Sequence, residues 1–99
     1  MLFYITDETS PVENILLFRK IDSYHKAKNL RAVLMEEEPD RYYAIHITKS
    51  EYMWAIEGET FYGEPTYYIF ETWDEAADFG HCCFANFNTD TDIIELDMV

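Results

Sequence analysis

The chain has 99 residues, 20 Asp and Glu against seven Lys and Arg, and a formal net charge of −13 at pH 7. Because 48% of it is hydrophobic, with seven Phe, eight Tyr and two Trp, it is too apolar for a disordered acidic tail, and one folded domain over residues 1–99 is expected. The negative charge excludes nucleic acid and anionic membranes as direct partners unless the seven bases cluster tightly.

The sequence carries no signal for a membrane or for export. There is no apolar run of about 18 residues, and "MLFYITDETS" at the N-terminus lacks the basic and apolar regions of a signal peptide. Cys82 and Cys83 are adjacent, and neighbouring cysteines rarely bond to each other. A cytoplasmic protein with two free thiols is expected, both cysteines being small buried residues on a helix.

The first strand is expected at residues 2–6, "LFYIT". "SPVE" at 10–13 resembles a helix start, so "ILLFRKI" at 15–21 could be a helix or a strand. We favour a strand, because the next segment, residues 22–40, is itself a helix. Ser23 caps this helix, and apolar residues recur along it at helical spacing until Pro39 ends it.

Alternating residues predict strands at 41–48 and 51–58, and a further strand is expected at 66–71 after a connection with Gly63 and Pro65. Thr72 and Glu75 then form a capping box. The helix that follows is expected to run to about Phe87. Its predicted buried residues are Ala76, Gly80, Cys83, Phe84 and Phe87. Residues 92–99 close the chain as a strand.

The two halves of the chain share this order of elements, and at an offset of 49 "IDSYHKA" (21–27) lies over "FETWDEA" (70–76). The overlay suggests that residues 1–49 and 50–99 are two ββαβ units, although capping chemistry alone makes such junctions look alike. We predict an α+β fold with a mainly antiparallel sheet of about six short strands and two helices on one face. The other face would then show aromatic and acidic residues to solvent, which favours a homodimer or another partner.

Metal, cofactor and catalytic signals are weak. His81, Cys82 and Cys83 diverge by about 100° per residue on a helix and cannot all face one ion. The acidic segment 88–95 fails as a calcium loop, because Ile93 and Val99 stand where Gly and Glu are needed. Acids near the thiols blunt their reactivity, and three glycines form no phosphate loop. No metal, no cofactor and no enzymatic activity are expected.

The charge is divided unevenly. Residues 1–49 carry 8 acids and 7 bases, whereas residues 50–99 carry 12 acids and no Lys or Arg. We expect the bases of the first helix region to pair with Glu36, Glu37 and Glu38 or with the acidic half. In the overlay Lys26 aligns with Glu75, so the second half has lost its bases while keeping its pattern.

The acids of the second half are spread over strands, loops and a helix, so a rigid scaffold holds them at fixed spacing. Duplex DNA carries about one charge per 1.7 Å of its axis, and a folded acidic surface can imitate that field. Nearby Tyr residues supply anchors of the kind that tight interfaces favour. The predicted partner-binding residues are Glu57, Glu59, Glu64, Glu71, Asp74, Glu75, Asp78, Asp90, Asp92, Glu95, Tyr62, Tyr67 and Tyr68.

In charge, size, aromatic content and compactness the chain resembles, as a class, the small acidic inhibitors of bacteriophages, which include DNA-mimicking anti-restriction and anti-CRISPR proteins and other host-takeover factors. The resemblance implies a basic, nucleic-acid-binding protein as partner, inside a bacterial host cell, and it assigns no residue roles. Two alternatives stay open: an interaction module or adaptor that acts through an aromatic sheet face, and a halophile's domain that is acidic only for solubility.

Overall fold

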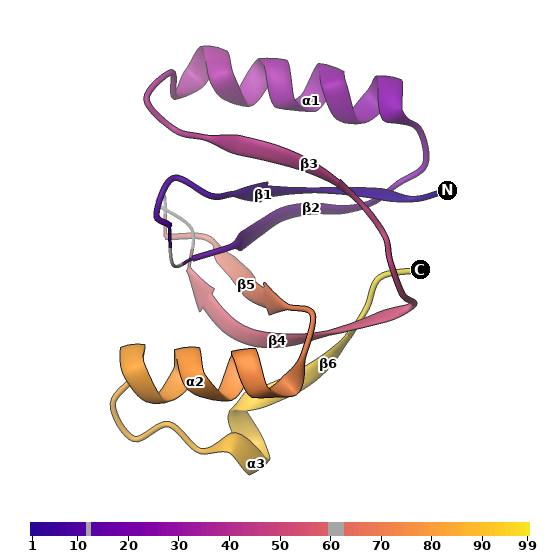
Figure 1. Ribbon diagram of the computed structural model, residues 1–99. Helices are drawn as coiled ribbons and strands as arrows, with labels where there is room; N and C mark the ends of the chain where they lie inside the picture. The colour runs from indigo at the N-terminus through magenta and orange to yellow at the C-terminus, as the bar shows by residue number, and fades with distance from the viewer. Residues whose placement is uncertain (12, 60–62) are drawn as a thin grey trace.

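The computed structural model describes residues 1–11, 13–59 and 63–99 (Figure 1). The strands are β1 (Phe3–Asp7), β2 (Ile15–Ile21), β3 (Tyr43–Ile47), β4 (Tyr52–Glu59), β5 (Pro65–Phe70) and β6 (Ile93–Asp97). The helices are α1 (Tyr24–Glu37), α2 (Trp73–Cys83) and the short α3 (Thr89–Asp92). The predicted α+β fold is confirmed.

The strands form one antiparallel sheet in the order β3-β1-β2-β5-β4-β6. The first strand of each half lies in the middle of three: β1 between β3 and β2, and β4 between β5 and β6. Among the described residues, the two halves of the sheet are joined where β2 pairs with β5, at Ile15↔Tyr68 and Leu16↔Tyr67, and the Ile69 N–H donates to the Asn14 carbonyl at 3.1 Å beside this pairing. A short junction therefore joins two three-stranded halves.

The predicted helix starts are confirmed by their caps. The Ser23 hydroxyl accepts a hydrogen bond from the Lys26 N–H, and the Thr72 hydroxyl accepts one from the Glu75 N–H. The favoured strand at 15–21 is also confirmed as β2. The segment before it starts no helix at the described residues 10, 11 and 13.

The second helix is shorter than predicted. It ends at Cys83 rather than Phe87, with Phe84 as its C-cap. The half-buried Phe84 and Phe87 then cover the cluster under the helix from the segment that follows it. Because these rings occupy that place, Cys82 and Cys83 are exposed free thiols, and the prediction of buried cysteines was wrong.

Three hydrophobic clusters build the core. One lies under α1 and one under α2. The third cluster, which we call the inner cluster, lies on the opposite face of the sheet and consists of Tyr4, Leu16, Met53, Ala55, Ile69, Leu96 and Met98. The inner face is continuous across the junction, because Leu16 belongs to the inner cluster and its partner Tyr67 packs against it.

The sheet folds over onto its inner face. Figure 1 shows α1 and α2 on opposite outer sides of the molecule, with the two halves of the sheet between them. Both helices thus cover one face of the sheet, as predicted. The other face is closed: Tyr4 is 4% exposed and Met98 is fully buried. The expectation of an open aromatic face was wrong, because sheet curvature turns that face inward.

The overlay of the two halves agrees with the structure in the first strands and the helices. Tyr4 and Met53 occupy matching positions and both belong to the inner cluster. Ala27 and Ala76 also match, and both are fully buried. The descent of both halves from one duplicated unit stays a hypothesis.

The overlay fails in the last strand of each half. Ile45 pairs across from Ile5, and Glu95 pairs across from Trp54. Since Ile5 and Trp54 match at an offset of 49, Ile45 corresponds to Glu95, at an offset of 50. The overlay at an offset of 49 places Ile45 on Ile94 and is therefore wrong by one residue in this strand, which reverses the face on which a strand residue lies.

Gly58 gives a test of packing under α2. A Cβ at Gly58 would overlap the Tyr68 ring, so we expect Gly58→Ala to destabilise the protein by about 1–3 kcal/mol, although Gly→Ala in a strand is otherwise favourable. The measurement is urea unfolding. The control is the same substitution in a Tyr68→Leu background, where the penalty should largely vanish; an equal penalty there would contradict the account.

Asp7 and Arg41 form a half-buried ion pair beside α1. The Arg41 Nη2 lies 2.6 Å and the Nε 2.9 Å from Asp7 Oδ2, and Thr9 donates from its N–H and hydroxyl to Asp7 Oδ1. Asp7 is only 6% exposed. Both carboxylate oxygens are therefore satisfied within the protein.

Removing Arg41 would leave the Asp7 carboxylate buried without its cation. We expect Arg41→Ala to lower the free energy of unfolding by about 3 kcal/mol. The control is Lys26→Ala, which breaks the exposed Lys26–Asp22 pair and should cost less than about 0.5 kcal/mol. Equal effects of the two substitutions would show that burial does not determine how much these ion pairs contribute to the free energy of unfolding.

Candidate interaction surface

Folding engages every base of the chain. Arg19 and Lys20 reach Asp97, which agrees with the expectation that some bases pair with the acidic half. Lys26 instead pairs with Asp22, next to its own helix. The contacts are Arg19 Nη1 to the Asp97 carbonyl (2.8 Å), Lys20 to Asp97 (3.4 Å), Lys26 to Asp22 (2.9 Å), Lys28 over the Tyr24 ring (5.9 Å), Arg31 Nε to the Tyr43 carbonyl (2.8 Å), Arg41 to Asp7 (2.6 Å) and Lys49 to Glu71 (2.7 Å).

The acids of the second half stay on the surface. All ten acids predicted to bind a partner are exposed. Lys49 and Lys20 provide ion pairs to Glu71 and Asp97. Eight of the ten form no ion pair with any residue that the structure describes: Glu57, Glu59, Asp74, Glu75, Asp78, Asp90, Asp92 and Glu95. The folded protein therefore keeps the charge asymmetry of its sequence.

Helix α2 carries three of these acids. Asp74 and Glu75 lie in its first turn, where the helix dipole favours negative charge. Asp78 stands one turn after Asp74, and like charges at this spacing destabilise a helix by a few tenths of a kcal/mol. The buried side of α2 is formed by other residues, Ala76 and Phe79 among them, so all three carboxylates are presented to solvent.

The remaining predicted acids fall into separate groups. Glu71 and Glu75 line one hollow, and Glu57 and Asp92 line another of about 410 Å³ beside Phe84. Asp92 also closes α3, because its Oδ2 accepts the Asn88 N–H at 2.8 Å. Glu64 lines a third hollow, together with residues of α1 and β2. The acids surround the second half rather than lining one cleft.

The predicted Tyr anchors contribute mainly to packing. Tyr62 lies outside the described residues. Tyr67 is half-buried against the inner cluster, and the half-buried Tyr68 ring lies 5.1 Å from Phe79. Burial, followed by the charge of nearby Glu13, raises the pKa of Tyr68. In the part of the acidic half that the structure describes, the more exposed aromatic residues are Tyr52 and Trp73. Neither was among the predicted partner-binding residues.

The hollow that Glu71 and Glu75 line lies on the inner side of the sheet, where the two halves of the sheet face each other. It measures about 170 Å³ and is lined by Tyr4, Thr6, Asn14, His46, Met53, Ile69, Phe70, Glu71 and Glu75. These residues come from β1, β3, β4, β5, α2 and the connections between them. No local sequence signal could have found the hollow, because only the strand order brings these segments together.

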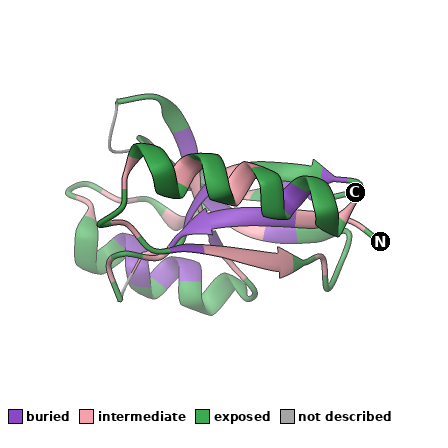
Figure 2. Ribbon diagram, turned by 90° about the horizontal axis from the view of Figure 1, so that it is seen from above, coloured by how far each residue is buried: buried purple, intermediate pink, exposed green. Residues whose placement is uncertain are grey.

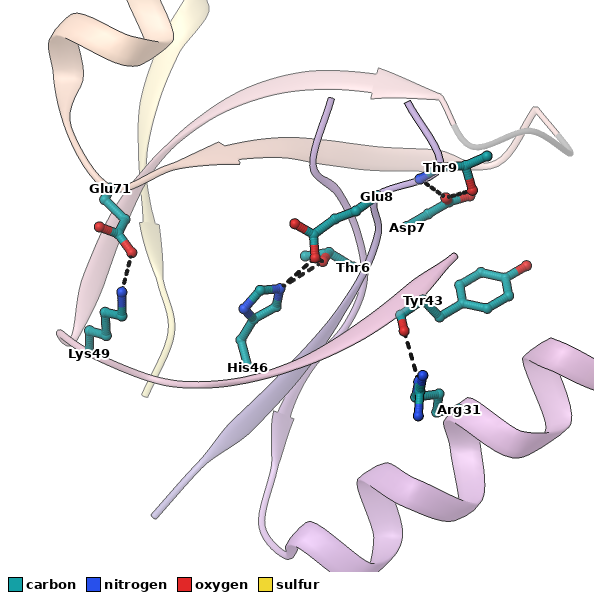
Figure 3. A network of polar contacts seen from close by, with 9 residues as sticks. All are labelled: Thr6, Asp7, Glu8, Thr9, Arg31, Tyr43, His46, Lys49 and Glu71. Carbon is teal, nitrogen blue, oxygen red and sulfur yellow. Dashed lines mark hydrogen bonds and ion pairs between the residues drawn. The ribbon is translucent and has the colours of Figure 1, made fainter. Parts of the chain in front are cut away.

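His46 and Tyr4 form the polar wall of this hollow. The two rings stack with centroids 4.9 Å apart and planes 18° apart. His46 Nε2 lies 3.0 Å from both Glu8 Oε2 and Thr6 Oγ1 (Figure 3). The Tyr4 hydroxyl makes no hydrogen bond within the described part of the chain. Burial, then the charges of Glu71 and Glu8, raise the pKa of Tyr4 to about 12.

Comparison of the chain with protein-family models, with curated proteins and with solved structures finds no match. Among the described residues, none of the helices has both the length and the apolar character required to cross a bilayer. The function is therefore argued from the surface itself.

The raised pKa of Tyr4 makes stability depend on alkaline pH. Neutral Tyr4 is favoured in the folded state, so its contribution is complete below pH 10 and is lost as the pH rises towards 12. We expect the wild type to lose on the order of 2 kcal/mol relative to Tyr4→Phe between pH 9 and 11.5, measured by urea unfolding. The other tyrosines are common to both proteins and cancel; parallel pH profiles would contradict the prediction.

Proposed function

We propose that the protein is a non-enzymatic inhibitor that presents its acidic half to a basic, nucleic-acid-binding protein and competes with nucleic acid for it. The supporting observation is that folding engages all seven bases in intramolecular contacts while all ten predicted acids stay exposed. A surface with this imbalance attracts cationic grooves that normally hold phosphates.

The scaffold supports this proposal because it fixes the acids in space. Asp74, Glu75 and Asp78 lie on a capped helix, and Glu95 lies on strand β6. Carboxylates on such elements lose little conformational freedom on binding, so preorganisation favours affinity. The exposed Trp73 at the start of α2 adds an apolar contact beside Asp74.

The class of target follows from the resemblance to acidic bacteriophage inhibitors. Restriction enzymes and CRISPR effectors hold nucleic acid in basic channels, and a phage protein of this type would block them in the host cytoplasm. The alternative of an interaction module with an aromatic sheet face lacks that face in the described structure, because the inner cluster closes it.

Competition for DNA tests the proposal. Purified restriction enzymes and CRISPR effectors bound to a fluorescent duplex are titrated with the protein, and displacement is read by anisotropy. We expect the affinity to fall at least tenfold, on the order of what screening implies, between 50 and 500 mM salt. Binding that is indifferent to salt would contradict an electrostatic mechanism.

Charge-matched variants locate the surface. Asp74→Asn, Asp78→Asn and Glu95→Gln together should weaken competition on the order of tenfold. The control makes the same charge change in the first half, with Glu36→Gln, Glu37→Gln and Asp40→Asn. If both triple variants weaken competition equally, only net charge matters and the second half is no specific surface.

A further inference from the structure

We propose that the hollow between the two halves, lined by Tyr4, His46, Phe70, Glu71 and Glu75, receives one lysine or arginine side chain of the basic partner. This inference rests on the proposed function and assigns a specific cation site within it. We call this site the cation hollow.

The size of the cation hollow selects its occupant. Pockets for drug-sized ligands measure roughly 300–1,000 Å³, whereas this one measures about 170 Å³. The end of one long side chain fits such a space. A nucleotide or other large metabolite does not.

The charges that line the hollow select a cation. Glu71 and Glu75 both contribute to its wall, and Glu8 lies behind it, 3.0 Å from His46. The aromatic residues Tyr4, His46 and Phe70 complete the lining. Carboxylates give a guanidinium or ammonium charge-assisted hydrogen bonds, and ring faces add cation–π attraction.

Tyr4 is a second and independent indication of a ligand. Its side chain is only 4% exposed, and its hydroxyl makes no hydrogen bond within the described residues. Since no buried side-chain oxygen of that part of the chain lacks a partner, the hydroxyl keeps contact with solvent and is free to bond a ligand in the hollow that Tyr4 lines. A cationic N–H group in the hollow would supply the donor for such a bond.

Lys49 already acts as an intramolecular stand-in for such a cation. It lies in the β3–β4 connection and its Nζ reaches Glu71 at 2.7 Å (Figure 3). Both side chains of this pair are more than half exposed, so the pair is weak and exchanges readily. A partner's side chain can displace Lys49 from Glu71.

The comparison of the two halves shows that the second half lacks a cation at this junction. At an offset of 49, Asp22 and Lys26 correspond to Glu71 and Glu75. The first pair is self-neutralising, with 2.9 Å between its charged groups. The second pair places two acids at the same spacing, so the matching junction of the second half needs a cation from elsewhere.

The experiment uses small cationic probes and needs no partner. N-acetyl-arginine methylamide and N-acetyl-lysine methylamide are titrated into the ¹⁵N-labelled protein at low salt, with N-acetyl-glutamine methylamide as the neutral control. We expect saturable amide shifts at Tyr4, Phe70, Glu71 and Glu75 with either cation. Scattered, non-saturating shifts, or equal shifts with the neutral probe, would overturn the proposal.

Variants give effects of opposite sign. Lys49→Ala removes the competing cation and should tighten probe binding about threefold, whereas Glu75→Gln should weaken it at least threefold, by the usual range for charged contacts. Glu36→Gln makes the same charge change on α1 and should leave probe binding unchanged. If Lys49→Ala does not tighten binding, or Glu36→Gln weakens it as much as Glu75→Gln, the proposal is wrong.

The two proposals fail separately. If the probes bind the cation hollow but no nucleic-acid-binding protein is displaced from DNA, the site stands and the inhibitory function falls. If the protein displaces DNA in a salt-dependent way but the probes give scattered, non-saturating shifts, the inhibitory function of the acidic surface is supported and the hollow is not its cation site.

Discussion

The architecture depends on the narrow junction between β2 and β5. In the described part of the chain two strand pairs, Ile15↔Tyr68 and Leu16↔Tyr67, connect the halves of the sheet, and the buried Thr66 hydroxyl donates to the Leu16 carbonyl beside them. Such a short connection lets the halves bend towards each other, so the face without helices closes on itself. Figure 2 shows the result: the burial is concentrated in the strands, while α1 is exposed along most of its length.

Closing the inner face decides where charge can go. Apolar residues fill the inside, so the acids of the second half must stay outside, and three of the bases, Arg19, Lys20 and Lys49, link the two halves. Lys20 adopts a left-handed conformation at φ 60, which is uncommon for a residue other than glycine. It lies where the β1–β2 register shifts, and from there its ammonium reaches Asp97. Lys49 bridges to Glu71 in the same way.

Local signals in the sequence were sufficient to predict the helices and strands. The sequence carries no comparable signal for contacts between segments that lie far apart in the chain. The caps at Ser23 and Thr72 and the alternation in the strands predicted α1, α2 and the six strands to within a few residues, except at the end of α2. The short helix α3 was not predicted. Hydrophobic alternation shows that a face is buried, but it does not say against what. The role of Tyr68 and the cation hollow depend on contacts between distant segments, so no spacing along the chain could reveal them.

At matching positions the second half has aromatic contacts where the first half has charged ones, and this explains how it folds without Lys or Arg of its own. In the first half Arg31 holds β3 through the Tyr43 carbonyl at 2.8 Å. The matching position in the second half is Gly80, against which the Phe87 ring packs so closely that any Cβ would overlap it. Aromatic packing on a glycine secures the helix without a cation. The second half is thus packed without Lys or Arg of its own, and its carboxylates stay on the surface.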